Sequence, residues 1–216
     1  MTNRNALARD DSGAALVEFS LVLVPLLIVV LGFMELGYQS YVRSVLQGSL
    51  NDVARVASVE NPSLGDSSLP LETRIQNRVK ARMSPLVRTG TYDFDISNYK
   101  DFASVGRPEA LVTDVNANGQ YDAGDCWKDT NPNGAFDLDG GQSGVGGADD
   151  VVVYHVTLSA PHLLPVAKLI GAGPKFDAKA ATMIRTQPYD EQGQAAVECR
   201  PAGQCISCAG TEVASR

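Results

Sequence analysis

The chain has 216 residues and a formal net charge of −7, a length suited to one ordinary domain with an appendage. The whole charge imbalance comes from residues 114–150, which hold eight Asp and one Lys, while the rest is neutral and has no basic patch of the kind that binds nucleic acid. Only two His occur, His155 and His162, and neither has a Cys, Ser or carboxylate partner at a motif spacing. The composition therefore argues against an enzyme and against a nucleic-acid-binding protein.

The N-terminus is polar up to Gly13 and then becomes apolar, with Glu18 and Glu35 as the charged residues of the stretch 14–36. About 20 helical residues cross the hydrocarbon core of a bilayer, so residues 14–37 predict a transmembrane helix, which Pro25 is expected to kink or loosen. A cleaved secretory signal would need small residues after the apolar run, and none form a convincing site. A simple signal anchor leaves Glu18 unexplained, since a carboxylate within a span costs about 2.5–3.5 kcal/mol.

A third interpretation is a leader that is cut before the apolar run. Gly13 is followed by Ala14, and Glu18 and Phe19 stand at the fifth and sixth positions after the cut, which resembles the motif of prepilin peptidases. The string SGAALVEFSLVLVPLLIVVLGFMELGY resembles the start of TadE-like proteins, the minor pseudopilins of tight-adherence (Flp, type IVb) pilus systems. The resemblance is close over residues 10–45, with a weaker echo in AKAATMIRTQPY.

The resemblance implies a non-enzymatic pseudopilin that a prepilin peptidase cuts between Gly13 and Ala14. Its partners would be other pilins or pseudopilins and the inner-membrane pilus platform. Its N-terminus would be cytoplasmic and its C-terminal domain periplasmic, with possible incorporation into the extracellular pilus. Glu18 could pair with the freed amine of Ala14 in a neighbouring subunit; the alternative is that it snorkels toward the headgroups.

The remaining chain alternates helical and strand patterns. Apolar residues at spacings of three and four from Val42 to Val56 extend the first helix, and residues 71–83 form a second helix whose basic side chains are solvated. Strands are expected at residues 91–97, 110–113, 150–160 and 176–185, with a short helix before the last. Because residues 150–160 are apolar on both faces, this strand is expected to be central. The fold class is α+β, a long N-terminal helix packed on a small, mainly antiparallel sheet with an inserted calcium-loop segment.

This order gives six segments. They are a leader (1–13), a transmembrane helix (14–37), amphipathic helices with the first strands (38–113), an acidic calcium-loop insertion (114–150), closing strands with a short helix (151–190) and a Cys-containing tail (191–216).

Two copies of the pattern D-x-N-x-N-G-x-x-D begin at Asp114 and Asp129. Ca²⁺ takes six to eight oxygens, and such loops offer side chains at positions 1, 3, 5 and 9, a backbone carbonyl at 7 and a Gly turn at 6. The repeat resembles the calcium loops of EF-hand, dockerin and thrombospondin type-3 modules, and aromatic residues at position 8 are expected to anchor both loops. The expected ligands are Asp114, Asn116, Asn118, Gln120, Asp122 and Asp125 in the first loop, and Asp129, Asn131, Asn133, Ala135, Asp137 and Asp139 in the second.

The second copy departs from the pattern, because position 12 is Gly140, so Asp139 or the more distant Asp149 and Asp150 are candidates to complete it. One or two structural calcium ions are expected, and the alternative is an acidic turn region without metal. The Gly-rich stretch 140–148 that follows predicts a flexible linker.

Four Cys occur: Cys126, Cys199, Cys205 and Cys208. An even number in an oxidising compartment predicts two disulfides with three possible connectivities. One bridge from Cys126 to the C-terminal group and one local bridge within that group are favoured over a redox pair at Cys205 and Cys208.

Two other functions are alternatives to the pseudopilin. A single-pass, membrane-anchored calcium-binding adhesion module would keep its first 13 residues and need no peptidase. A membrane-tethered hydrolase has no pairing of nucleophile and base in the sequence to support it.

Overall fold

The structure is a computed structural model that describes residues 12–122, 124–164, 166–169, 171, 173–188 and 190–199. Residues 1–11 of the predicted leader and residues 200–216 of the predicted tail lie outside this description.

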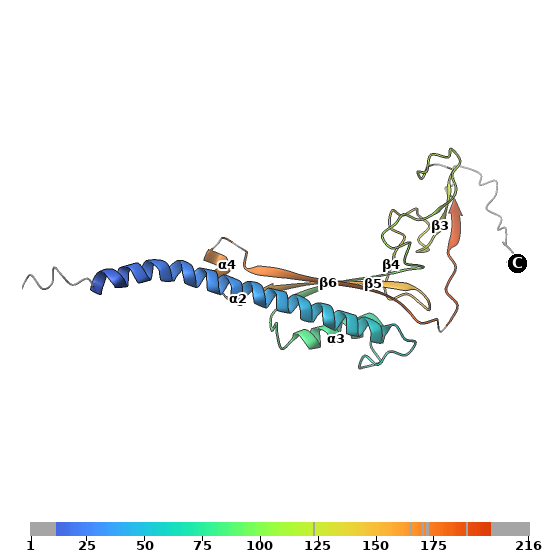
Figure 1. Ribbon diagram of the computed structural model, residues 1–216. Helices are drawn as coiled ribbons and strands as arrows, with labels where there is room; N and C mark the ends of the chain where they lie inside the picture. The colour runs from blue at the N-terminus through green and yellow to red at the C-terminus, as the bar shows by residue number, and fades with distance from the viewer. Residues whose placement is uncertain are drawn as a thin grey trace, which may run out of the picture.

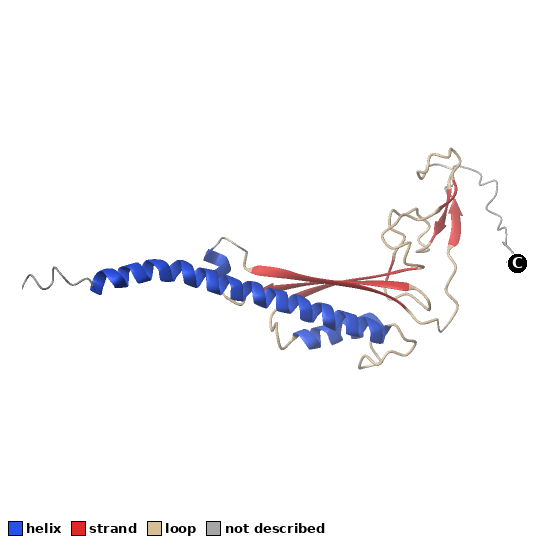
Figure 2. Ribbon diagram, viewed as in Figure 1, coloured by secondary structure: helices blue, strands red, loops and turns tan. Residues whose placement is uncertain are grey.

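One long helix, α2 (Ser12–Ala57), organises the molecule and continues through Pro25, so the expected loosening there is not seen. Its first half projects beyond the rest of the protein, and its second half lies along a sheet (Figures 1 and 2). Val42, Leu46 and Leu50 in that second half are fully buried. The predicted amphipathic continuation of the apolar helix is therefore confirmed.

The main sheet has the order β4-β1-β5-β6 and is antiparallel throughout. Its strands are β1 (Thr91–Tyr99), β4 (Gln142–Ser143), β5 (Val151–Pro161) and β6 (Lys175–Arg185). β5 lies between β1 and β6 and is therefore central, as predicted. Its alternate residues Val152, Tyr154, Val156 and Leu158 fill the core between the sheet and α2. The short predicted helix is α4 (Val166–Leu169), which lies beside α2 (Figure 1).

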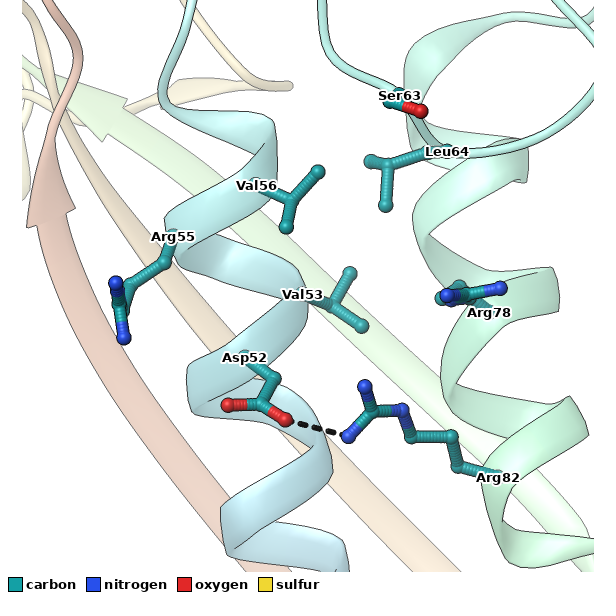
Figure 3. A pocket seen from close by; sticks show the side chains of 8 residues that line it. All are labelled: Asp52, Val53, Arg55, Val56, Ser63, Leu64, Arg78 and Arg82. Carbon is teal, nitrogen blue, oxygen red and sulfur yellow. Dashed lines mark hydrogen bonds and ion pairs between the residues drawn. The ribbon is translucent and has the colours of Figure 1, made fainter.

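Helix α3 (Leu71–Met83) has the bounds that the sequence predicted and packs on α2 through Ile75, Val79 and Met83. Arg78, Lys80 and Arg82 are exposed, as expected, whereas Arg74 is partly buried and donates a hydrogen bond to the carbonyl of Pro62. Arg82 forms an ion pair with Asp52 of α2. Figure 3 shows this ion pair at the edge of a pocket of about 310 Å³ between the two helices. The pair is largely solvated, so apolar burial holds the helices together.

A second sheet, with the order β2-β3-β7, lies at the end of the molecule away from the apolar half of α2 (Figure 1). It consists of β2 (Leu111–Thr113), β3 (Cys126–Asp129) and β7 (Ala196–Cys199). β3 and β7 were not predicted, because four residues of mixed polarity show no period of two. The predicted calcium-loop insertion is thus part of a small sheet that the C-terminal region completes.

The prediction that residues 140–148 form a flexible linker is wrong. Residues 142–143 form β4 beside β1, and the side-chain amide of Asn98 donates hydrogen bonds to the carbonyls of Gln142 and Gly144. A Cβ atom at Gly141 would lie 2.7 Å from the Tyr99 ring, and one at Gly146 2.8 Å from Asn98. The glycines therefore permit close packing here rather than flexibility.

Candidate functional site

The first half of α2 is an apolar surface that the protein itself leaves uncovered. In the described part of the chain, α2 is the helix long and apolar enough to cross a membrane, and none of its most apolar window is buried. The exposed side chains are Leu16, Val17, Phe19, Leu21, Val22, Val24, Leu26, Leu27, Ile28, Val29, Val30, Phe33, Met34 and Leu36. So large an apolar patch marks a membrane or protein contact, and the helix fits a membrane anchor.

The residues of the predicted processing motif lie at the start of this helix. Gly13 and Ala14 belong to the first turn of α2, and Glu18 and Phe19 are exposed one turn later. Ala14 and Glu18 are four residues, about one helical turn, apart along the chain.

The second carboxylate of the apolar stretch, Glu35, has a structural role. It is 6 % exposed and accepts hydrogen bonds from the backbone N–H groups of Leu163 (3.3 Å) and Leu164 (2.9 Å) and from the Gln39 amide (3.2 Å). Its Oε1 also lies 2.9 Å from Nδ1 of His162. His162 thus has a carboxylate partner that no motif spacing indicated, and Glu35 fixes the β5–β6 connection onto α2.

The first acidic loop, residues 114–125, folds around its first carboxylate. Asp114 accepts hydrogen bonds from the N–H groups of Asn118 (3.3 Å) and Gly119 (2.7 Å). The side-chain amides of Asn116 and Asn118 donate to Asp122 at 3.0 and 2.7 Å. Gly119 has φ 73°, a left-handed conformation that favours glycine. The sharp turn expected at position 6 is therefore present.

The second acidic loop, residues 129–140, repeats this arrangement. Asp129 accepts from the N–H groups of Asn133 (3.3 Å) and Gly134 (2.8 Å). The side-chain amides of Asn131 and Asn133 donate to Asp137, and Gly134 has the same φ of 73°. The two copies seen in the sequence are thus two copies in conformation.

Aromatic residues at position 8 join the loops to each other and to the second sheet. Tyr121 and Phe136 stack with ring centroids 4.3 Å apart, and Trp127 of β3 meets both rings edge-on at 5.3 and 6.4 Å. The expectation that these aromatics anchor the loops is confirmed. The two loops are therefore in direct contact through this cluster.

The disulfide predicted between Cys126 and the C-terminal group joins it to Cys199, across β3 and β7. Cys205 and Cys208, with the predicted local bridge, lie outside the described residues.

The remaining expected ligands lie as follows. Gln120 and Ala135 occupy position 7 of the two loops, and each donates its N–H to the Asn two residues earlier. Asp139 accepts from the Tyr99 hydroxyl and from the Gly141 N–H.

Asp149 and Asp150, the more distant candidates, form ion pairs with Arg185 and Lys100, respectively. In the described part of the chain, no group of three or more His, Cys, Asp or Glu side chains is gathered as a metal site. Any cation in these loops would also need amide and carbonyl oxygens, which the calcium pattern supplies.

One acidic residue at the loops was missed by sequence reasoning. Glu109 is 5 % exposed and accepts hydrogen bonds from the backbone N–H groups of Thr130 (2.7 Å) and Asp137 (3.2 Å). It stands 20 residues before the second loop begins, so no motif spacing could have associated it with that loop.

The N-terminal segment of the chain is similar to a known protein family. Residues 13–55 match the family model of TadE-like protein, which confirms the resemblance noted in the sequence. No curated protein and no solved structure matches the chain. The matched segment is most of α2, including the exposed apolar half and the first buried turns. Residues 13–55 are thus similar to the TadE-like family.

Proposed function

We propose that the protein is a non-enzymatic minor pseudopilin that takes part in the assembly or initiation of a tight-adherence (Flp, type IVb) pilus. The observation that carries the proposal is the TadE-like match on α2, whose apolar half is exposed on the folded protein. That half would sit in the inner membrane and contact other pilins or pseudopilins and the membrane platform.

In this proposal a prepilin peptidase cuts between Gly13 and Ala14, the N-terminus is cytoplasmic and both sheets are periplasmic. The Cys126–Cys199 disulfide supports this orientation, because disulfides persist in the periplasm and are rare in the cytosol. The length of α2 agrees as well, since 46 residues extend over about 69 Å and the bilayer core takes about 30 Å. The rest of the helix carries the main sheet outside the membrane.

Glu18 is proposed to pair with the freed amine of Ala14 in a neighbouring subunit. The observation that supports this is the exposure of Glu18 near the start of the helix, within an otherwise apolar surface. An ion pair offsets the cost of placing each charge in an apolar environment.

Glu18→Ala is expected to reduce the number of assembled pili by at least about tenfold, because removing one partner of a buried pair costs about 3–5 kcal/mol. Membrane insertion of the subunit is expected to be unchanged or improved, since the substitution removes a charge from the span. Pili are counted by electron microscopy, and the membrane-bound subunit by immunoblot. The matched control is Glu60→Ala, an exposed glutamate beyond the end of α2. Normal piliation in Glu18→Ala cells would contradict the proposed pairing.

We also propose that the acidic loops bind Ca²⁺ as a structural ion, with one site in each loop. Support comes from the matching conformations of residues 114–125 and 129–140 and from the concentration of eight Asp within residues 114–150. Asp149 and Asp150 have basic partners, but without a cation the six Asp of residues 114–139 repel one another. Dissociation constants of about 10⁻⁴–10⁻³ M are sufficient for Ca²⁺ sites in an extracellular compartment. The ions would order a long segment of low apolar content at the outer end of the protein.

A further inference from the structure

The first acidic loop ends in a carboxylate that bridges its two arms. Asp125, at position 12, accepts a hydrogen bond from the N–H of Val115 at Oδ1 (2.9 Å) and from the N–H of Asp122 at Oδ2 (2.7 Å). These donors are positions 2 and 9 of the loop. The residue is fully buried. Position 12 is where calcium loops of this pattern place their final, often bidentate, carboxylate.

The second loop has Gly140 at position 12, and Glu109 occupies the place of the missing side chain. One oxygen of Glu109 accepts from the N–H of Thr130 (2.7 Å) and the other from the N–H of Asp137 (3.2 Å). These donors are again positions 2 and 9. The carboxylate of Glu109 therefore bridges the second loop just as that of Asp125 bridges the first, although it comes from the chain before β2.

Gly140 and Glu109 fit each other. A Cβ atom at Gly140 would lie 3.0 Å from Cγ of Glu109 and 2.5 Å from Oγ1 of Thr130. The absence of a side chain at position 12 is thus what makes room for the glutamate from outside the loop. The backbone holds Glu109 in place as well, since its N–H donates to the carbonyl of Asp137 at 3.0 Å.

Burial and charge at the two loops point to a bound cation. Glu109, Asp125 and Asp129 are 5 %, 0 % and 2 % exposed, and within the described ranges none of them forms an ion pair with a Lys, Arg or His side chain. Buried carboxylates are ordinarily paired or coordinate a metal. In addition, Oδ1 of Asn131, the oxygen expected to coordinate from position 3, is buried and has no hydrogen-bond partner.

We infer that Glu109 supplies the final carboxylate ligand of a Ca²⁺ site in the second loop, in place of a residue at position 12. The inference rests on the proposal that the loops bind Ca²⁺, and it replaces Asp139 as the residue that completes the site. The first site is then contained within one loop. The second is composite and needs the segment before β2 to lie against the loop after β3, which couples calcium binding to formation of the second sheet.

The test is calorimetric titration of the full-length protein in detergent micelles with Ca²⁺, starting from chelator-treated samples. Wild-type protein is expected to bind two ions. Asp125→Asn leaves the second site, and adding Glu109→Gln to it is expected to weaken the remaining binding at least about 100-fold, because one ligand charge is lost. Glu198→Gln is the matched control, since Glu198 is an exposed glutamate in the same sheet. Glu109→Asp, which keeps the charge on a shorter stem, is expected to weaken the second site alone.

The possible results separate the two proposals. Suppose that the wild type binds two ions and that the double variant Asp125→Asn/Glu109→Gln binds its remaining ion as tightly as Asp125→Asn does. That result would overturn the role of Glu109 and leave calcium binding in place. No binding by the wild type would overturn both. If Glu109→Gln loses its fold, as judged by Trp127 fluorescence before calcium is added, Glu109→Asp decides: unchanged affinity at the second site overturns the inference.

Discussion

Replacement of both Cys126 and Cys199 by Ala is expected to lower the free energy of unfolding of the second sheet by about 2–4 kcal/mol. The disulfide joins residues 73 apart in the sequence, so it removes many conformations from the unfolded chain. The strands that it connects, β3 and β7, have only four residues each. Two such short strands have little stability of their own.

Trp127 makes this effect measurable, because it is the one tryptophan of the chain, is 3 % exposed and lies in β3. Urea unfolding of the full-length protein in detergent is followed by Trp127 fluorescence. The midpoint of the transition is expected at a lower urea concentration in the double variant than in the wild type. The control is Cys205→Ala/Cys208→Ala, which keeps the Cys126–Cys199 bridge. An unchanged midpoint in Cys126→Ala/Cys199→Ala would show that the bridge is not a major support of this sheet.

Removal of Ca²⁺ is the second change with a large expected effect. If calcium is present at 10 to 100 times its dissociation constant, each bound ion stabilises the folded state by about 1.4–2.7 kcal/mol. The loss should appear at Trp127, because Tyr121 and Phe136 connect both loops to this residue. The main sheet and its packing on α2 should be much less affected, since they lie outside the loops.

The measurement is the same urea transition in excess Ca²⁺ and in a chelator, with Mg²⁺ as the cation control. The wild type is expected to unfold at lower urea in the chelator, and Asp114→Ala/Asp129→Ala to unfold at one midpoint in both buffers. A wild-type transition that does not respond to Ca²⁺ would leave residues 114–150 as an acidic turn region.

The elements that the sequence predicted well are those whose patterns are local. Helix α3 is predicted by a mixed-charge segment that stops before Pro85, and strand β5 by alternating apolar residues, and the structure has both within one residue of the expected bounds. The apolar half of α2 was equally clear, because no polar residue interrupts it for long. These features depend on short-range spacing, which a sequence displays directly.

The features that were missed depend on contacts between distant residues. Glu109 reaches the second loop only because β2 pairs with β3, and His162 meets Glu35 only because the β5–β6 connection returns to α2. Residues 140–148 looked flexible in composition, yet their glycines fit against Tyr99 and Asn98. In each case tertiary packing decided the outcome, and no spacing along the chain encodes it.

The N-terminal sequence and intact mass of the protein from its native membrane test the central claim most directly. The proposal predicts a chain that begins at Ala14, because a prepilin peptidase would cut after Gly13. A chain that begins at Met1 or Thr2 would contradict the proposal and favour a membrane-anchored calcium-binding adhesion module. A chain that begins beyond Leu36 would contradict it as well, because the apolar helix would then be a cleaved secretory signal.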